Sequence, residues 1–141
     1  MAELLLRGWN TAIPEVDVGD DIFVVRDSDG NMHRVQVKTA VAKPLKSGHS
    51  AQFNLSLSQL SMPIEPEIIY VFAVRLHSHW DAFVVIDREI LYNEHVLHDI
   101  GNKREDRLTL RLRFTGTGVT CGQRDLSQYR NNWTRFPIVE H

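Results

Sequence analysis

The stretch Val16–Lys38, VDVGDDIFVVRDSDGNMHRVQVK, decides how the rest of the chain is interpreted. An apolar run begins at Ile22, a polar break lies at residues 27–31, and polar and apolar residues then alternate up to Lys38. This pattern is typical of two antiparallel strands joined by a tight turn. The stretch therefore predicts a β-hairpin.

The turn of this hairpin sets which residues face each other. Asp29 and Gly30 are a preferred pair for a two-residue turn, and such a turn places Asp21 opposite Lys38. An acid and a lysine in these positions form an ordinary cross-strand ion pair, worth roughly 0.2 to 1 kcal/mol. This first interpretation requires no function.

The two faces of the hairpin differ in chemistry, because successive side chains of a strand point to opposite sides. One face collects the apolar residues Ile22, Val24, Val35 and Val37. The other face collects a carboxylate, an amide and an ammonium group, which belong to Asp21, Gln36 and Lys38. We therefore expect one face to join the core and the other to carry polar groups at close quarters.

An acidic cluster, Asp17, Asp20 and Asp21, stands at the entrance to the first strand. Like charges this close repel each other unless a cation lies among them. Mg²⁺, or Mn²⁺ in its place, takes oxygen ligands and leaves positions for water and phosphate. We therefore predict a metal site of Asp21 and Gln36, with Asp17 or Asp20 as a further ligand. Lys38 beside it would orient or activate a water molecule, or offset charge on a phosphate.

Two short motifs in this stretch resemble those of a known nuclease family. Residues 17–21, DVGDD, are similar to the D-x-G-x-D approach to the catalytic strand, and residues 36–38, QVK, to a Q-x-K signature. These motifs belong to the PD-(D/E)XK nuclease superfamily, in the variant found in Mrr-type restriction endonucleases and some group I intron homing endonucleases. The order of the motifs and their strand and turn context carry the resemblance.

The resemblance implies a metal-dependent endonuclease that hydrolyses DNA phosphodiester bonds with Mg²⁺ (or Mn²⁺). It implies that Asp21 is the main metal ligand, that Gln36 gives its amide oxygen, and that Lys38 positions or deprotonates the attacking water. It also implies a homodimer, since family members commonly present two sites to two strands. In the family the first helix is longer and carries a glutamate, and we expect most of that helix to be missing here.

Two alternatives remain open from the sequence. One is a nuclease-like module that no longer cuts and instead binds DNA or a protein partner. The other is an unrelated β-rich protein in which Asp21 and Lys38 merely pair. The intact trio of Asp21, Gln36 and Lys38 favours the enzyme, whereas the short first helix favours the module.

Length and charge limit the organisation of the chain. A chain of 141 residues predicts one nuclease-like domain, 1–141, with a core at 9–90 and a basic C-terminal extension at 101–141. The net charge is -2, yet the extension carries +4 and residues 1–100 carry -6. Four basic residues are candidates for contact with a nucleic acid: Lys43, Lys46, Arg111 and Arg113. A solvated strand face explains these arginines equally well.

The remaining patterns predict a fold class. Apolar runs and alternations predict strands at 51–57, 68–76, 80–86 and 108–114. We therefore expect a strand-rich α/β (α+β) fold with a central mixed β-sheet and flanking helices, as in restriction endonucleases. We also expect a mobile loop at 93–107 and a last helix at 126–133. With one cysteine and no apolar run of about 20 residues, we expect a cytoplasmic protein without a membrane span.

Overall fold

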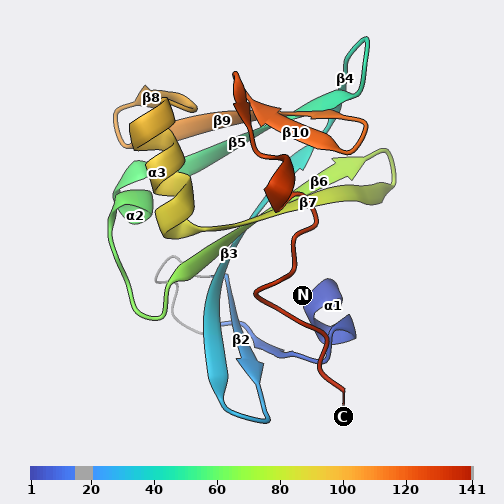
Figure 1. The fold of residues 1–141 in the computed structure, drawn as a ribbon, viewed down its shortest axis with the longest axis vertical. Helices are drawn as coiled ribbons and strands as arrows, with labels where there is room; N and C mark the ends of the chain where they lie inside the picture. The colour runs from blue at the N-terminus through green and yellow to red at the C-terminus, as the bar shows by residue number, and fades with distance from the viewer. Residues whose placement is uncertain (15–20, 141) are drawn as a thin grey trace.

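The structure, a computed structural model, describes residues 1–14 and 21–140. Within these residues, the strands form two β-sheets, and short helices lie at the margins of the sheets (Figure 1). The predicted α+β, strand-rich fold is confirmed. The helical elements are α1 (Ala2–Leu6), α2 (Leu57–Ser61), α3 (Arg88–His98) and the 3₁₀ turn η1 (Ser127–Tyr129).

The first sheet is mixed, as the sequence predicts. Its strands lie in the order β1-β2-β3-β6-β7, where β3 and β6 are parallel and all other pairs are antiparallel. Residues 68–74 of β6 are buried without alternation, because both faces of this central strand are covered. The strands of this sheet are β1 (Asn10–Ala12), β2 (Ile22–Arg26), β3 (Asn31–Val41), β6 (Ile68–Leu76) and β7 (His79–Asp87).

The predicted hairpin exists as β2 and β3, but its predicted register is wrong by two residues. Arg26 pairs with Asn31, so the turn contains four residues instead of two. Arg26 holds this wider turn, since its guanidinium donates to the Asp29 carboxylate and its carbonyl accepts from Gly30 N at 2.8 Å. The shift by two keeps every side chain on its predicted face and moves Asp21 from Lys38 to Gln36.

A second sheet, which the sequence does not predict, covers one face of the first. Its order is β11-β10-β9-β5-β4, with β8 paired to β9, and all its pairs are antiparallel. β5 and β9 pair over eight residues although about 50 residues of chain separate them. The strands are β4 (Lys43–Pro44), β5 (His49–Ser56), β8 (Asn102–Arg104), β9 (Arg107–Thr115), β10 (Gly118–Cys121) and β11 (Arg124–Asp125).

Two hydrophobic clusters hold these layers together. The larger cluster lies between the sheets, where Phe72 of β6 meets Phe53 of β5 with 4.9 Å between ring centroids. The smaller cluster covers the other face of the first sheet and includes Trp9, Trp133 and Phe136. Residues 101–141 therefore supply β9 to the second sheet and aromatic side chains to the core of the first.

Two expected segments differ from the structure. The loop expected at 93–107 is wrong, because α3 extends to His98 and β8 pairs with β9. The buried residues of α3 include the charged Glu94 as well as Leu91. The sequence therefore lacks the apolar residues at every third or fourth position that are typical of an amphipathic helix. The helix expected at 126–133 is also wrong, since only η1 forms there before the chain continues across the first sheet.

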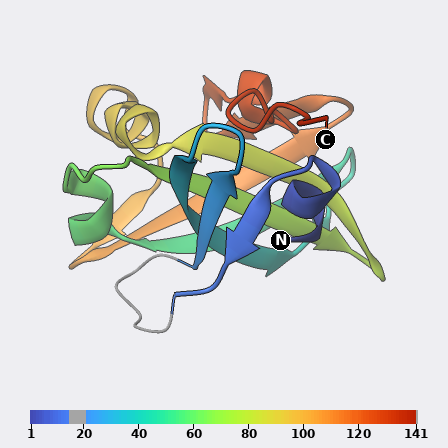
Figure 2. The ribbon, with the colours of Figure 1, turned by 90° about the horizontal axis from the view of Figure 1, so that it is seen from below.

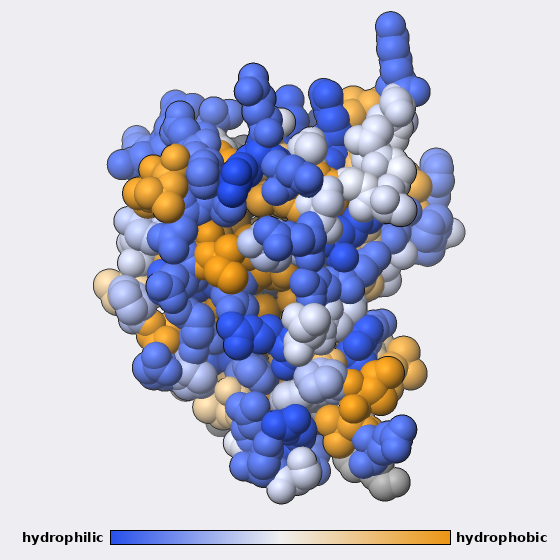
Figure 3. All heavy atoms as spheres, in the orientation of Figure 1, coloured by the Kyte–Doolittle hydropathy of each residue, from blue (hydrophilic) through white to orange (hydrophobic). Residues whose placement is uncertain are grey.

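The hairpin and the second sheet lie at opposite ends of the molecule, as Figure 1 shows. Viewed from the hairpin end, both chain ends lie near α1 (Figure 2), where Val139 N donates to the carbonyl of Arg7 at 2.8 Å. Polar residues cover most of the face shown in Figure 3, and apolar residues gather over α1, whose Leu5 and Leu6 are exposed. No helix among the described residues has the length and apolar character needed to cross a membrane.

Candidate active site

Asp21 lies directly before β2 and is fixed by the neighbouring strand. Its backbone N–H donates to the carbonyl of Val35 at 3.0 Å, which continues the ladder of the hairpin. Its Oδ2 accepts two hydrogen bonds, from Gln36 Nε2 at 2.9 Å and from the backbone N–H of Val37 at 2.7 Å. The carboxylate is therefore held against β3 while the residue as a whole stays exposed.

Gln36 is a buried polar side chain, with 7% of its surface exposed. Its nitrogen donates to Asp21, whereas its Oε1 is buried and has no hydrogen-bond partner among residues 1–14 and 21–140. A buried acceptor without a partner costs about 1 to 3 kcal/mol. This oxygen therefore accepts no hydrogen bond within the described residues and is available to a ligand.

Lys38 follows Gln36 by two residues along β3, so both side chains leave the same face of the sheet. On the parallel neighbour β6, Gln36 aligns with Tyr70 and Lys38 aligns with Phe72. This face of the first sheet is the one that turns toward the second sheet. The structure thus brings Asp21 and Gln36 into contact and places Lys38 next along the same row.

The remaining predicted metal ligands, Asp17 and Asp20, lie outside the described residues. Among the described residues, no group of three or more His, Cys, Asp or Glu side chains is arranged around a common point. The donors that are described, the carboxylate of Asp21 and the orphan oxygen of Gln36, are hard oxygen ligands and fit Mg²⁺ or Mn²⁺ by type. A half-turn of the planar amide exchanges its nitrogen and oxygen and turns that oxygen toward Asp21.

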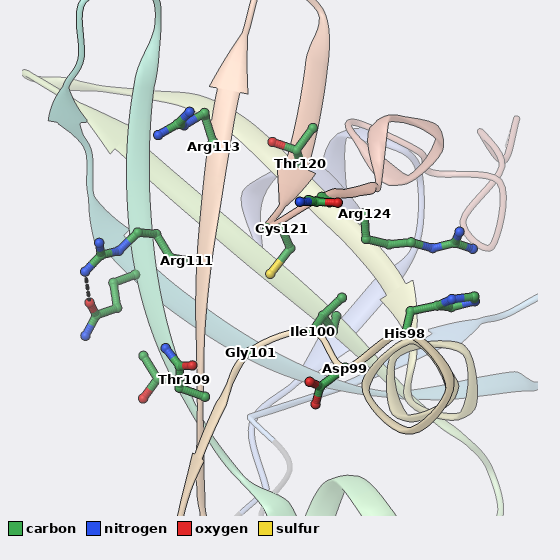
Figure 4. Close-up of a pocket in the computed structure, with 14 residues that line it drawn as sticks. His98, Asp99, Ile100, Gly101, Thr109, Arg111, Arg113, Thr120, Cys121 and Arg124 are labelled. Carbon is green, nitrogen blue, oxygen red and sulfur yellow. Dashed lines mark hydrogen bonds between the residues drawn. The ribbon is translucent and has the colours of Figure 1, made fainter.

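A cavity lies elsewhere, on the second sheet. It has a volume of about 700 Å³ and opens between α3, β8, β9 and β10 (Figure 4). Cys121 lines its floor, and burial raises the pKa of the Cys121 thiol, while backbone N–H groups of Arg111 and Gly101 oppose that rise. Asp21, Gln36 and Lys38 do not line this cavity.

The four basic residues that the sequence proposes for nucleic-acid contact lie on the second sheet and its β4–β5 turn. Arg111 and Arg113 are exposed on β9, as the alternation of that strand predicts. Lys43 of β4 aligns with Arg113 through Ser50 of β5, and Lys46 is exposed in the turn that follows. Three of the four therefore share one surface, which belongs to a different sheet from Asp21.

Sequence reasoning missed two residues of that surface, Gln52 and Asn54 on β5. Both are exposed and lie opposite Arg111 and Thr109 of β9. The signal was present, because Gln52 and Asn54 alternate with the buried residues Phe53 and Leu55. Only the pairing of β5 with β9 makes them neighbours of the arginines.

Comparison with known proteins identifies the fold. No family model matches the chain, and no curated protein matches it. The chain is similar to the solved structure of a bacterial homing endonuclease, I-Ssp6803I, with a TM-score of 0.56 and 21% sequence identity, over 94% of this chain and 78% of the other. The chain has an endonuclease-like fold.

Proposed function

We propose that the protein is a metal-dependent endonuclease of the PD-(D/E)XK superfamily, in its Q-x-K variant, and that it cuts DNA. The observation that carries this proposal is the contact between Asp21 and the buried amide of Gln36. The residues of both motifs occur in the expected order, and the fold is shared with a homing endonuclease. A homodimer that presents one site to each DNA strand belongs to the same proposal.

Each residue of the site has a separate task in this proposal. Asp21 and Gln36 would hold a divalent cation through their oxygens, with Asp17 or Asp20 completing the acidic side. Such a cation acts as a Lewis acid toward phosphate and lowers the pKa of a bound water. Lys38, one position further along the row, orients the attacking water and offsets negative charge that grows on the phosphate. The backbone N–H of Val37 keeps the Asp21 carboxylate turned toward β3.

Cleavage of supercoiled plasmid with Mg²⁺ or Mn²⁺ tests the proposal. We expect Asp21→Asn and Lys38→Ala each to lower the nicking rate by about 100-fold or more. Asparagine keeps an acceptor for Val37 N–H, so the hairpin stays intact in that variant. Asp27→Asn, an exposed carboxylate of the same hairpin, is the matched control and should nick at the wild-type rate.

Two variants of Gln36 distinguish a role in metal binding from a role in packing. Gln36→Ala removes an oxygen donor and should lower both nicking and the heat of Mn²⁺ binding in calorimetry. Gln36→Glu supplies a carboxylate oxygen in the same place and should retain both. Equal nicking by the wild type, Asp21→Asn and Lys38→Ala would mean that the activity belongs to a contaminant, and the enzyme assignment would then be withdrawn.

A second candidate function is a DNA-binding module that does not cut. It is favoured by the hydrogen bonds of Asp21, because a carboxylate that accepts from Gln36 and Val37 also serves as a simple cap for the hairpin. In this case Mn²⁺ binding and nicking are both absent, while binding to DNA persists. The plasmid assay and a gel-shift assay on the same sample distinguish the two functions.

A further inference from the structure

The outer face of the second sheet is a continuous polar surface. Register places outward residues in four rows across the strands, and each row joins residues that are far apart in sequence. The central rows pair Gln52 with Arg111, and Asn54 with Thr109 and Asn102. The outer rows contain the remaining basic residues, Lys43, Arg104, Arg107 and Arg113. The rows hold one acidic residue, Asp125, and no apolar side chain, and at the end of one row Ser56 donates to Asp106 of the β8–β9 turn.

The arginines of this surface differ from the other arginines in their partners. Six arginines elsewhere have an acidic side chain within 4.0 Å: Arg7, Arg26, Arg88, Arg124, Arg130 and Arg135. Within the described part of the chain, the four arginines of the outer face have no such partner. In a chain with net charge -2, this leaves a concentrated positive charge on one face. A surface of this kind attracts a polyanion.

We infer that this outer face, strands β5 and β9 at its centre, lies in the major groove of duplex DNA and reads base pairs. The inference rests on the proposed function and adds to it a residue set that determines sequence specificity. The surface carries the side chains that recognise base edges, since Arg pairs with guanine and Asn or Gln with adenine. Lys43, Lys46, Arg104 and Arg107 at its margins contact the phosphates on either side.

Hydrogen bonds on the surface hold these side chains in place. Arg111 Nη2 donates to Gln52 Oε1 at 3.3 Å, the contact drawn in Figure 4, and the other guanidinium donors remain available. Thr109 Oγ1 donates to Asn54 Oδ1 at 2.8 Å, which leaves the amide nitrogen of Asn54 to donate outward. The side chain of Arg113, unlike those of Arg111 and Asn54, has no hydrogen-bond partner in residues 1–14 and 21–140. Arg111 and Asn54, which are held by these hydrogen bonds, lose less entropy when they meet a base pair.

The dimensions of the strands match those of the groove. Two antiparallel strands lie about 4.8 Å apart, and a major groove of about 12 Å admits such a pair. Residues two apart on one strand, such as Arg111 and Arg113, are separated by about 6.8 Å, or two base-pair steps of about 3.4 Å. The two arginines are therefore expected to read guanines two pairs apart. The cavity of about 700 Å³ beside Arg111 gives room for the base edges.

Selection of bound duplexes from a random DNA pool tests the inference, without divalent metal so that reading is measured apart from cutting. The wild type should enrich a consensus sequence. Arg111→Ala and Arg113→Ala should each lose the preference at one position and weaken binding to the consensus by about 5- to 150-fold. Asn54→Asp keeps the acceptor for Thr109 and should change an adenine preference to cytosine. Arg75→Ala, an exposed arginine of the first sheet, is the matched control and should leave the consensus unchanged.

Several outcomes overturn the inference. One is that the wild type enriches no consensus, and another is that none of these variants alters the consensus. A third is that the arginine variants lose affinity equally for selected and random DNA. A fourth is that Arg75→Ala loses as much affinity for the consensus as they do. Equal binding of duplex RNA also overturns it, because side chains cannot read the narrow major groove of A-form RNA. If the variants alter the consensus as expected but the protein nicks no plasmid, the proposed nuclease activity is rejected and the reading surface is retained. If the protein nicks plasmid but enriches no consensus, the reading surface is rejected and the proposed nuclease activity is retained.

Discussion

The two sheets of this protein bury their residues in opposite ways. The first sheet is covered on both faces, and its central strand β6 has seven consecutive buried residues, 68–74. The second sheet is covered on one face, and β9 alternates strictly between buried leucine or phenylalanine and outward polar residues. A strand covered on both sides leaves its side chains little freedom to move. The outward half of β9 is free to meet a partner.

If the proposed function holds, this difference separates the two tasks of such an enzyme, cutting DNA and recognising it. Asp21, Gln36 and Lys38 belong to the β2–β3 hairpin of the two-sided sheet, where hydrogen bonds and packing fix the carboxylate and amide. Arg111 and Arg113 belong to the one-sided sheet, where substitutions alter the surface without altering the core. Under the proposed function and the inferred reading surface, chemistry would lie on the rigid sheet and recognition on the open one, as functional sites on fixed scaffolds generally require.

The largest expected effect concerns the contact between the sheets. Phe72 is 1% exposed and packs edge-on against Phe53 of the second sheet. Phe72→Ala leaves a cavity there and should lower the free energy of unfolding by about 3 to 5 kcal/mol. Arg111→Ala, on the open face, should change it by less than about 0.5 kcal/mol. Urea denaturation measures both values, and similar losses would break the contrast between the sheets.

A smaller effect on stability is expected at Gly48, where the backbone packs closely against β9 of the second sheet. Gly48 has φ +83°, and a Cβ there would lie 1.9 Å from the carbonyl oxygen of Phe114. Gly48→Ala should therefore cost about 3 kcal/mol, from backbone strain and displacement of β9 together. Gly116 also has positive φ, but a Cβ there meets nothing within 4 Å, so Gly116→Ala should cost only about 1 kcal/mol. Equal costs, measured by thermal unfolding, would mean that β5 and β9 separate easily at this end.

The smallest effect is a pH dependence in the first sheet. His33 lies between the rings of Trp9 and Phe136, at 5.4 and 5.1 Å, and its Nε2 has no hydrogen-bond partner among the described residues. Burial lowers the pKa of His33 below 6.5, and the positive charge of Arg135 lowers that pKa further, while Asp87 opposes this and Arg26 adds a minor decrease. Because the unfolded chain takes up the proton first, His33 contributes to stability above pH 6.5, and this contribution is lost as the pH falls below that value.

Comparison of the wild type with His33→Phe isolates this contribution. Phenylalanine keeps the aromatic packing and removes the titrating group, so the difference in Tm between the two proteins should change between pH 7 and pH 5. The Tm of the wild type should fall more than the Tm of the variant when the pH is lowered from 7 to 5. Parallel curves of Tm against pH would show that His33 accepts a proton in the folded state without cost.

Much of the hairpin and of the strand content was predictable from local sequence. Alternation assigned Gln36 and Lys38 to one face, and the strand at 68–76 occurs with the predicted bounds. The register of the hairpin was not predictable from its Asp-Gly pair. The ion pair of Arg26 with Asp29 and the hydrogen bond from Gly30 to the Arg26 carbonyl favour the four-residue turn, and a turn preference alone does not include them.

The sequence by itself determined which residues alternate, which are apolar and which acids and amides stand near one another, because these properties depend on spacing along the chain. Tertiary structure alone decided that β5 pairs with β9 and that Asp21 meets Gln36. The first brings together residues about 50 positions apart, and the second depends on a turn held by a side-chain ion pair. The pairing of β5 with β9 follows from the packing of the whole core, which no local pattern contains.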